Sequence, residues 1–295
     1  TMDYHDNHKN SKVDSLTFKL ATNHRNKTTN ELKSIDLKPM DVVIVTAASN
    51  EFFRGLTEFV ASVHFWEPRT KIVVYDIGLT LLQKQDVHTW CNVESLNLPK
   101  TTPPRILLGS RNGFAWKPII LQDAVRRYGA IFYSDAGSVI RGPLGPIKRL
   151  ILKDGYFFVQ GQDTDMTMKT HKGMFSYFNV TKSRFINKYS FAGGIQGYVN
   201  NSTAVKHILT PLVHCALKRS CISPRGSHVL NHRYDQSALS IIIYMSSLNI
   251  QPHTEFLAAD RSQLNKDPLE ESKRLIWTAR QFSSDYRLKT LCIKN

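Results

Sequence analysis

The chain has 295 residues, of which 41% are hydrophobic and 10% aromatic, enough to bury the core of one large domain or of two smaller ones. The 39 Lys and Arg against 24 Asp and Glu give a net charge of +15, which favours phosphates, nucleic acid or acidic glycans as partners. The basic residues are spread along the chain, without the aromatic interleaving of an RNA-binding sheet or the spacing of a zinc finger, so no nucleic-acid partner is expected.

Residues 1–38 are polar, rich in Asn, Lys, Thr and Ser, and lack apolar periodicity, which predicts a stem or an irregular N-terminal segment. No run approaches the roughly 18 apolar residues of a membrane span, and the first residues are too polar for a signal peptide. A membrane would therefore be reached only through an anchor absent from this sequence. Residues 39–295 contain no clear linker or internal repeat, and we expect them to form a single domain.

Strands and helices alternate through the first half of the chain. Runs of β-branched and apolar residues predict the strands, and apolar residues at helical spacing predict the helices between them. This alternation favours a mainly parallel sheet with right-handed crossover connections. The strands are expected at 41–49, 71–76 and 130–133, and the helices at 53–63, 81–89 and, beginning near Pro118, up to Gly129.

Asp135 follows the third predicted strand, in the sequence Ser-Asp-Ala-Gly-Ser. A carboxylate at the end of a short buried strand lies at the carboxyl edge of the sheet, where open α/β folds bind their ligands. A structural role in a turn or as a helix cap suits an Asp in such a sequence equally well. The rest of the chain favours Asp135 as the centre of the active site.

The second half of the chain is less regular. The segment 162–180 is long and polar and is expected to form a mobile active-site loop. Two strands are predicted around it, and the second is rich in glycine, which allows close approach of a ligand or another backbone. These strands are expected at 155–160 and 191–200, and helices at 203–218 and from Asp235 to Met245.

The four cysteines include no close Cys-x-x-Cys pair, which argues against a zinc site. Cys215 and Cys221 bracket a short polar loop, and we predict that they form a disulfide, as in proteins of the secretory pathway. Glycosylation sequons favour the same compartment, at Asn26, Asn179, Asn200 and Asn201. We expect the lumen of the endoplasmic reticulum or Golgi, as part of a type II membrane protein, or secretion.

Five segments, in this order, resemble nucleotide-sugar glycosyltransferases of the GT-A fold: VVIVTAASNEFFRGL, KIVVYDIGLT, FAWKP with IFYSDAGSVI, FAGGIQGYV and YDQSALS. The chain is similar to the retaining family that includes glycogenin and the bacterial lipopolysaccharide galactosyltransferases, and more closely to an animal nucleotide-diphospho-sugar transferase-like family. Over about residues 40–255 the resemblance implies a Rossmann-like α/β/α sandwich with a mainly parallel central sheet. It also implies an enzyme that moves a sugar from a nucleotide-sugar, expected to be a UDP-sugar, to a glycan or glycoprotein acceptor.

The resemblance assigns donor-binding roles to residues of the first half. Thr46, Ala47 and Asn50 would line the pocket for the base and ribose, with an ordinary strand-to-helix turn capped by Ser49 as the alternative. Lys117 matches a lysine that precedes the same helix in the glycogenin pattern and would face the ribose or a phosphate. The alternative is a solvated surface lysine, which is the more common situation for any single Lys.

In the second half, the resemblance places Gly193 and Gly194 where the backbone passes close to the donor sugar, and gives Gln196 a sugar hydroxyl to bind. A tightly packed strand explains the glycines equally well. Asp235 and Gln236 match the Asp-Gln pair that opens a late helix in the retaining family. Asp235 would accept hydrogen bonds from sugar hydroxyls and Gln236 would lie near the anomeric carbon, the alternative being an acidic residue that favours the helix dipole.

Asp135 matches the first residue of the family's Asp-x-Asp motif, which binds manganese or magnesium, but Gly137 stands where the second Asp is expected. One carboxylate with phosphates and water can still hold a hard cation, so Asp135 is the predicted ligand for a metal that the pattern neither requires nor excludes. Asp163 and Asp165 form a complete Asp-x-Asp sequence and are a second candidate metal site, for which a solvated loop or an acceptor contact is the alternative. His253 could replace the metal-binding His of the glycogenin pattern, although a lone His more commonly has a structural place.

These motifs distinguish three classes of function. A nucleotidyltransferase would need a Gly-rich basic phosphate loop after the first strand, which TAASNEFFRG does not supply. A catalytically weak or inactive module that binds acidic glycans is favoured by the +15 charge and by Gly137. We expect a glycosyltransferase, retaining by resemblance, with an acidic acceptor; inversion would instead need a carboxylate such as Asp235 as a general base.

Overall fold

The computed structural model describes residues 41–107, 113–258, 274–278, 286 and 290–294. The predicted stem, residues 1–38, lies outside these ranges, so the division of the chain at residue 38 stays a prediction. No helix of the described part is long and apolar enough to cross a membrane.

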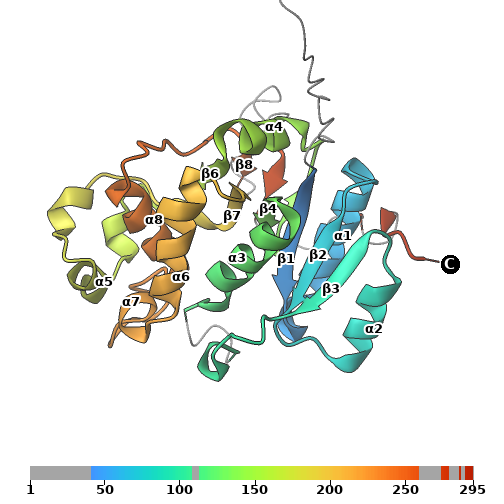
Figure 1. Ribbon diagram of the computed structural model, residues 1–295, viewed down its shortest axis with the longest axis horizontal. Coiled ribbons are helices and arrows are strands. Elements are labelled where there is room, and N and C mark those ends of the chain that lie inside the picture. The colour runs from blue at the N-terminus through green and yellow to red at the C-terminus, as the bar shows by residue number, and fades with distance from the viewer. Residues whose placement is uncertain (1–40, 108–112, 259–273, 279–285, 287–289, 295) are drawn as a thin grey trace, which may run out of the picture. The chain divides into compact units, whose positions relative to one another are not determined.

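A six-stranded mixed sheet, in the order β3-β2-β1-β4-β7-β6, forms the centre of the described part (Figure 1). The first four strands of this order are mutually parallel, and β7 runs antiparallel to both of its neighbours. β1 is buried along its whole length, as expected for a central strand covered on both faces. The strands are β1 Val42–Ala48, β2 Ile72–Asp76, β3 Val93–Asn97, β4 Ala130–Ser134, β6 Tyr156–Gln160 and β7 Phe191–Val199.

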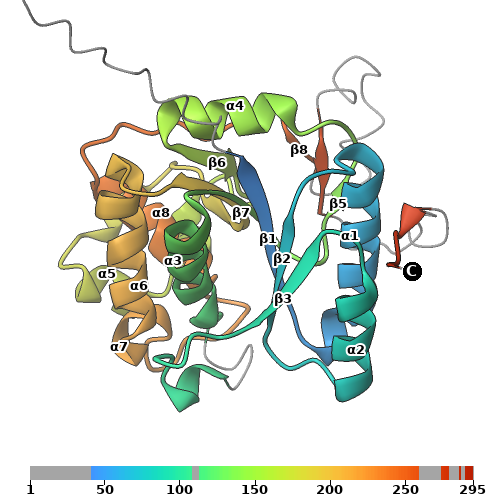
Figure 2. The ribbon, with the colours of Figure 1, turned by 45° about the vertical axis from the view of Figure 1, so that its right-hand side comes forward.

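Helices cover both faces of this sheet (Figure 2). Alternate residues of β1 point to opposite faces, so Val42 and Ile44 pack in one hydrophobic cluster and Val43 and Val45 in the other. The first cluster includes α1 Phe53–Trp66, α2 Leu81–Thr89 and α4 Gly145–Asp154; the second includes α3 Trp116–Tyr128, α5 Lys172–Tyr177, α6 Thr210–Ala216, α7 Arg219–Ile222 and α8 Asp235–Met245. The predicted α/β sandwich with a mainly parallel sheet is confirmed.

The polar segment 162–180 differs from its prediction as a loop, because it contains short helices. Asp165 caps a 3-10 helix by accepting a hydrogen bond from the Thr167 N–H at 2.8 Å, and the His171 ring likewise accepts one from the Gly173 N–H at the start of α5. Met174 and Phe175 are buried in the core. The polar composition hid these elements, since only a few apolar residues anchor them.

Other elements were not anticipated from the sequence. β3 and α4 were missed, as was a small sheet of β5 Val139–Ile140, β9 Ile276–Trp277 and β8 Leu257–Ala258, whose two-residue strands leave no periodicity to detect. α3 begins at Trp116, so Pro118 lies inside its first turn and not at the first position. The expected helix 203–218 contains a π-helical stretch, Val205–Leu209, before α6.

Two disulfides are present in the described part. Cys215 and Cys221 are joined across the loop between α6 and α7, with their Cα atoms 5.2 Å apart. Cys91 is joined to Cys292, a link across 201 residues that the sequence spacing did not reveal. Disulfides persist in oxidising compartments, and this pair is consistent with one.

Candidate active site

Asp135 lies directly after β4, at the carboxyl edge of the sheet, with its side chain 28% exposed. Its N–H donates to the Gly194 carbonyl on β7 at 2.9 Å, and its own carbonyl accepts from the Ser138 N–H at 3.0 Å to close a tight turn. The backbone therefore has the turn role considered above. The side chain has separate partners, because Oδ1 accepts a hydrogen bond from the Tyr133 hydroxyl at 2.7 Å.

Lys117 joins this carboxylate to a second one. Its ammonium nitrogen lies 3.1 Å from Asp135 Oδ1 and 3.0 Å from Asp235 Oδ2, and it donates to the Gly193 carbonyl at 3.3 Å. The lysine side chain is only 6% exposed, so the alternative of a solvated surface lysine is wrong. Three residues that the sequence singled out separately, on α3, after β4 and at the start of α8, thus form one cluster.

The electrostatics of this cluster follow from two carboxylates sharing one ammonium. Burial lowers the pKa of Lys117, but the attraction of Asp135 and Asp235 outweighs this and leaves the pKa above its usual value. Burial raises the pKa of Asp235, and the charge of Asp135 adds to this rise while Lys117 opposes it. The lysine is therefore firmly protonated, and the two carboxylates together exceed its charge.

Gly193 and Gly194 let β7 pass directly against the two carboxylates. A Cβ at Gly194 would lie 2.5 Å from Asp135 Oδ2, and one at Gly193 would lie 2.9 Å from Asp235 Oδ2. Real Cβ atoms do not approach so closely, so any larger residue would displace a carboxylate. The sequence predicted a close approach here, and the structure shows that the cluster itself requires it.

Gln196 is buried two residues further along β7. Its amide donates to the Gly193 carbonyl at 2.8 Å and accepts from the Tyr198 hydroxyl at 2.7 Å. Both the nitrogen and the oxygen of the Gln196 amide are thus bonded within the protein. The amide nitrogen and the Lys117 ammonium donate to the same Gly193 carbonyl. A direct contact between Gln196 and a sugar hydroxyl stays a prediction.

A cavity of about 350 Å³ opens beside the cluster. Asp135, Gly194 and Gln236 all line it. Gln236 donates from its amide nitrogen to Ser190 Oγ at 3.2 Å and to Asp163 Oδ2 at 3.3 Å, and no described residue donates to its amide oxygen. Gln236, the predicted catalytic residue, and Asp135, the predicted metal ligand, therefore line the same cavity.

Arg233 is the cation that the sequence did not single out. It lines the cavity, and its Nε lies 3.6 Å from Asp163 Oδ2. With its amide oxygen turned towards the guanidinium, Gln162 accepts a hydrogen bond from Arg233 at 3.0 Å. Its position three residues before Gln236 was the available signal, since both residues line the same cavity.

Thr46, Ala47 and Asn50 lie outside the lining of this cavity. Thr46 and Ala47 are buried in β1, and no described residue pairs with the Thr46 hydroxyl. Asn50 is exposed in a 3-10 helix and accepts from the Gln83 amide at 2.7 Å, and Ser49 makes no side-chain cap there. β1 pairs with β4, so these residues share an edge of the sheet with Asp135, and their contact with a base or ribose stays a prediction.

The described side chains around Asp135 do not complete a divalent metal centre by themselves. Gly137 offers no side chain, and Asp135 Oδ1 is already shared by Tyr133 and Lys117. Within the described ranges, no three His, Cys, Asp or Glu side chains lie close enough together to hold a metal ion. Hard cations need several oxygen ligands, so this set falls short of a protein-built site.

The other candidate metal ligands have structural partners. His253 pairs with Glu255 Oε1 at 2.9 Å and stacks on Phe157 with ring centroids 5.1 Å apart. Asp165 is used as a helix cap, while Asp163 faces Gln236 and Arg233. The two carboxylates of the literal Asp-x-Asp sequence therefore serve different partners.

Comparisons with known proteins bear on the fold. Residues 9–122 match the family model described as "Protein of unknown function (DUF1647)". No curated protein matches the sequence. Among solved structures, the apo bifunctional glycosyltransferase WbbM is similar, with a TM-score of 0.50 at 12% identity over 82% of this chain and 46% of that chain.

Two further glycosyltransferase structures resemble the chain at similar levels. GlyE of Streptococcus pneumoniae TIGR4 has a TM-score of 0.49 at 14% identity over 83% of this chain and 56% of its own. The galactosyltransferase LgtC, solved with donor and acceptor sugar analogs, has a TM-score of 0.46 at 14% identity over 80% and 86%. At these identities the likeness concerns the fold alone, and this chain spans less than half of WbbM. The GT-A-like fold expected from the sequence is confirmed.

Proposed function

We propose that this chain is a glycosyltransferase that moves a sugar from a UDP-sugar donor to a glycan or glycoprotein acceptor. The observation that carries the proposal is the cluster of Lys117, Asp135 and Asp235, held at the carboxyl edge of a GT-A-like sheet beside a cavity lined by Gln236. Ligands of open α/β folds bind at this edge. The carboxylates suit sugar hydroxyls, which donate hydrogen bonds to ionised oxygens.

Arg233 is proposed to receive the diphosphate of the donor. A guanidinium presents several donors in one plane and matches phosphate oxygens, and Asp163 and Gln162 orient it in the cavity wall. A unit charge about 4 Å from a phosphate oxygen contributes about 4 kcal/mol at an effective dielectric near 20. Arg233 would therefore offset the charge that grows on the leaving group as the glycosidic bond breaks.

Retention of configuration is the proposed stereochemical course. Gln236 lines the cavity with an amide oxygen that receives no hydrogen bond from a described residue, so this oxygen can face the anomeric carbon. Asp235 is a poor general base for inversion, because its carboxylate is buried and paired with Lys117 at 3.0 Å. We propose that Asp235 positions the donor through its hydroxyls.

We also propose that donor binding needs no divalent metal, because the Arg233 guanidinium in the cavity wall can neutralise the diphosphate charge that a metal would otherwise balance. Removing metal with a chelator should leave the affinity for the nucleotide-sugar unchanged, and adding manganese should not improve it. Calorimetric titrations under the two conditions measure this. A donor affinity that appears only with manganese would contradict the proposal.

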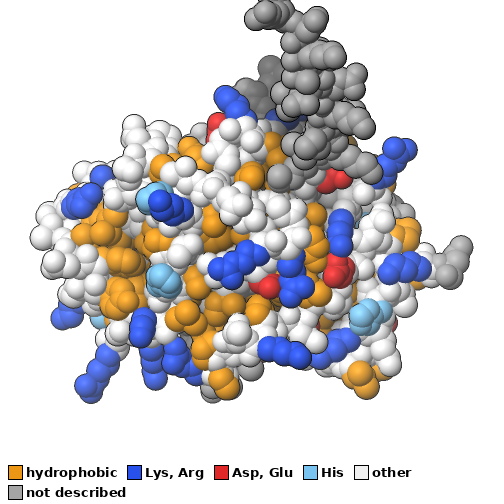
Figure 3. Space-filling model, in the orientation of Figure 1, with side chains coloured by type: hydrophobic (Ala, Val, Ile, Leu, Met, Phe, Trp, Pro, Cys, Tyr) orange, Lys and Arg blue, Asp and Glu red, His pale blue; other side chains and the backbone are white. Residues whose placement is uncertain are grey.

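The acceptor is proposed to be acidic, and the compartment to be the lumen of the endoplasmic reticulum or Golgi. Figure 3 shows Lys and Arg side chains scattered over the whole of one face, with few Asp and Glu among them. Such a surface attracts anionic glycans at long range. The two disulfides support an oxidising lumen.

A screen of nucleotide-sugars for binding and slow hydrolysis tests the proposed function. We expect one UDP-sugar to bind, and Arg233→Ala to weaken that binding by about tenfold or more. Arg225→Ala is the matched control, because Arg225 is an exposed arginine that does not line the cavity. A folded protein that binds acidic glycans but no nucleotide-sugar would favour the inactive glycan-binding module instead.

A further inference from the structure

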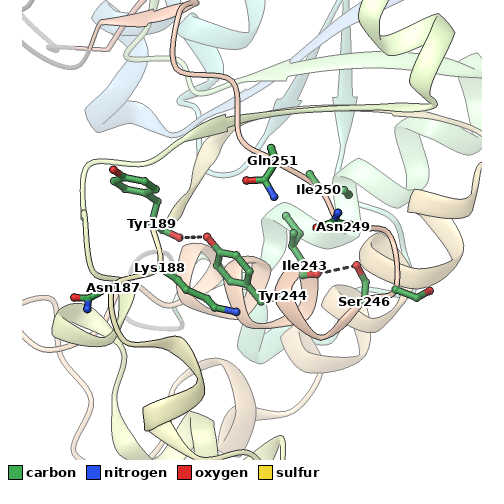
Figure 4. A pocket seen from close by; sticks show the side chains of 10 residues that line it. Asn187, Lys188, Tyr189, Ile243, Tyr244, Ser246, Asn249, Ile250 and Gln251 are labelled. Atoms are coloured by element: carbon green, nitrogen blue, oxygen red, sulfur yellow. Dashed lines mark hydrogen bonds between the residues drawn. The ribbon is translucent and has the colours of Figure 1, made fainter.

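A second cavity, of about 420 Å³, lies at the carboxyl end of α8 (Figure 4). One wall comes from the segment 187–189 and another from the chain that leaves α8, over residues 246–251. In Figure 4, Tyr189 lies on one side, Tyr244 and Gln251 lie near the middle, and Asn249 and Ser246 lie on the other side. None of these residues belongs to the cavity beside Asp135.

The lining has the chemistry that recognises saccharides. Tyr189 is 46% exposed, and the Tyr244 hydroxyl donates to the Tyr189 carbonyl at 2.8 Å, which fixes the two tyrosine-bearing segments together. Aromatic faces pack against the apolar face of a sugar ring, and side-chain amides offer both a donor and an acceptor to its hydroxyls. Amides come from Asn187, Asn249 and Gln251, and no acidic residue lines the cavity.

One basic residue gives this cavity its charge. Lys188 lines the wall, with its ammonium 4.8 Å from the centre of the Tyr244 ring. This contact holds the ammonium beside the aromatic surface. A carboxylate or sulfate on a saccharide would meet a cation there and no competing anion.

Two rigid connections join this cavity to the candidate active site. On α8, Gln236 lines the first cavity and Tyr244 the second, and these two residues are about 12 Å apart along the helix axis. Ser190, the neighbour of Tyr189 in the chain, accepts a hydrogen bond from Gln236 at 3.2 Å. A short oligosaccharide has the length to reach from one cavity towards the other.

We propose that the second cavity binds a saccharide chain and holds the distal part of the acceptor while its end reaches the active site. The acceptor role rests on the proposed glycosyltransferase function; saccharide binding by the cavity does not. Tyr189 provides the stacking face, Gln251 and Asn249 bind hydroxyls, and Lys188 selects acidic units where they are present.

Binding of defined oligosaccharides to the full chain tests the proposal, with neutral N-acetyllactosamine oligomers and sulfated glycosaminoglycan fragments as probes. We expect one class to bind, and Tyr189→Ala and Gln251→Ala each to weaken it by about tenfold, with a matching rise in acceptor KM. Tyr177→Ala is the control, since Tyr177 is 42% exposed on α5 and does not line the cavity. Affinity that falls with added salt identifies the acidic class, and affinity insensitive to salt the neutral class.

Equal affinity of Tyr189→Ala, Gln251→Ala and the unmodified chain would overturn the proposal, as would failure of both probe classes to bind. Donor hydrolysis measured on the same samples separates this inference from the proposed function. Saccharide binding lost on mutation, in a protein that never turns over a nucleotide-sugar, would uphold the site and reject the transferase.

Discussion

Lys117 is held by three oxygen atoms, from Asp135, Asp235 and Gly193, and its side chain is almost out of contact with water. The sequence marked these residues one by one, through their positions next to predicted elements. It could not show that they meet, because α3, the end of β4 and the start of α8 are brought together only by tertiary packing. Tyr133 was predictable as a partner of Asp135, because residues two apart in extended chain point to the same side of a sheet.

Lys117→Met should destabilise the protein more than removal of a surface ion pair. The change leaves Asp235 buried with no opposite charge from Lys117, and loss of one partner of a buried pair costs roughly 3–5 kcal/mol. Lys71→Met is the matched control, because Lys71 pairs with Glu94 at 2.6 Å with both side chains exposed, at 48% and 39%, and should cost about 1 kcal/mol or less. Chemical denaturation measures both. Similar losses in the two variants would show that the cluster is not a buried charge network.

Among the elements, the strands of the central sheet other than β3 were the most predictable, and the short helices were the least. Each buried strand is a continuous apolar run that ends at a turn, whereas the helices of 162–180 depend on caps such as Asp165 and His171 within a polar stretch. The candidate active site was predictable to the extent that it lies at strand and helix ends. The second cavity was not, because its walls come from loops without a pattern.

His232 ties the segment that carries Arg233 and Gln236, two residues that line the cavity, to α5 and α7. This ring is 1% exposed, accepts a hydrogen bond from the His171 N–H at 3.2 Å, and lies 3.2 Å from the Ile222 carbonyl. Neutral imidazole satisfies both contacts, with one nitrogen accepting and the other donating. Burial lowers the pKa of His232 to about 4.

Stability should therefore fall as the pH drops from the unfolded pKa of 6.5 to about 4. In this window the unfolded chain binds a proton at this position and the folded chain does not. Protonation of His232 in the unfolded chain therefore lowers the free energy of unfolding by roughly 3 kcal/mol between pH 6.5 and pH 4. Denaturation at a series of pH values measures this, with His232→Asn losing less over the window. His88→Asn, at an exposed position, should behave like the unmodified protein. Parallel losses in both variants would argue against a neutral buried His232.

For the whole molecule, the charge of +15 exceeds what one diphosphate needs. Long-range attraction between exposed charges is screened beyond roughly 8 Å at physiological salt. The charge was evident from composition alone, but its distribution over the surface required the structure. The two disulfides show the same contrast, since a sequence separation of 6 suggested one of them and a separation of 201 concealed the other.

An acidic acceptor should bind more weakly as salt rises, while donor affinity changes less, because the proposed donor residues Asp135 and Arg233 are partly buried. Acceptor KM across a salt series measures this. A flat response, or a preference for uncharged glycans, would show that the basic surface does not serve the acceptor.

The central claim is that the cluster around Lys117 is the donor site of a transferase, and transfer by Asp135→Asn tests it most directly. The substitution keeps the shape of the side chain and removes its charge beside Lys117 and Tyr133. Transfer from the donor found in the nucleotide-sugar screen should fall by about a hundredfold or more, with the fold intact by circular dichroism. Asp86→Asn, at an exposed position on α2, should retain full activity. A well-folded Asp135→Asn protein with near-normal transfer would contradict the account.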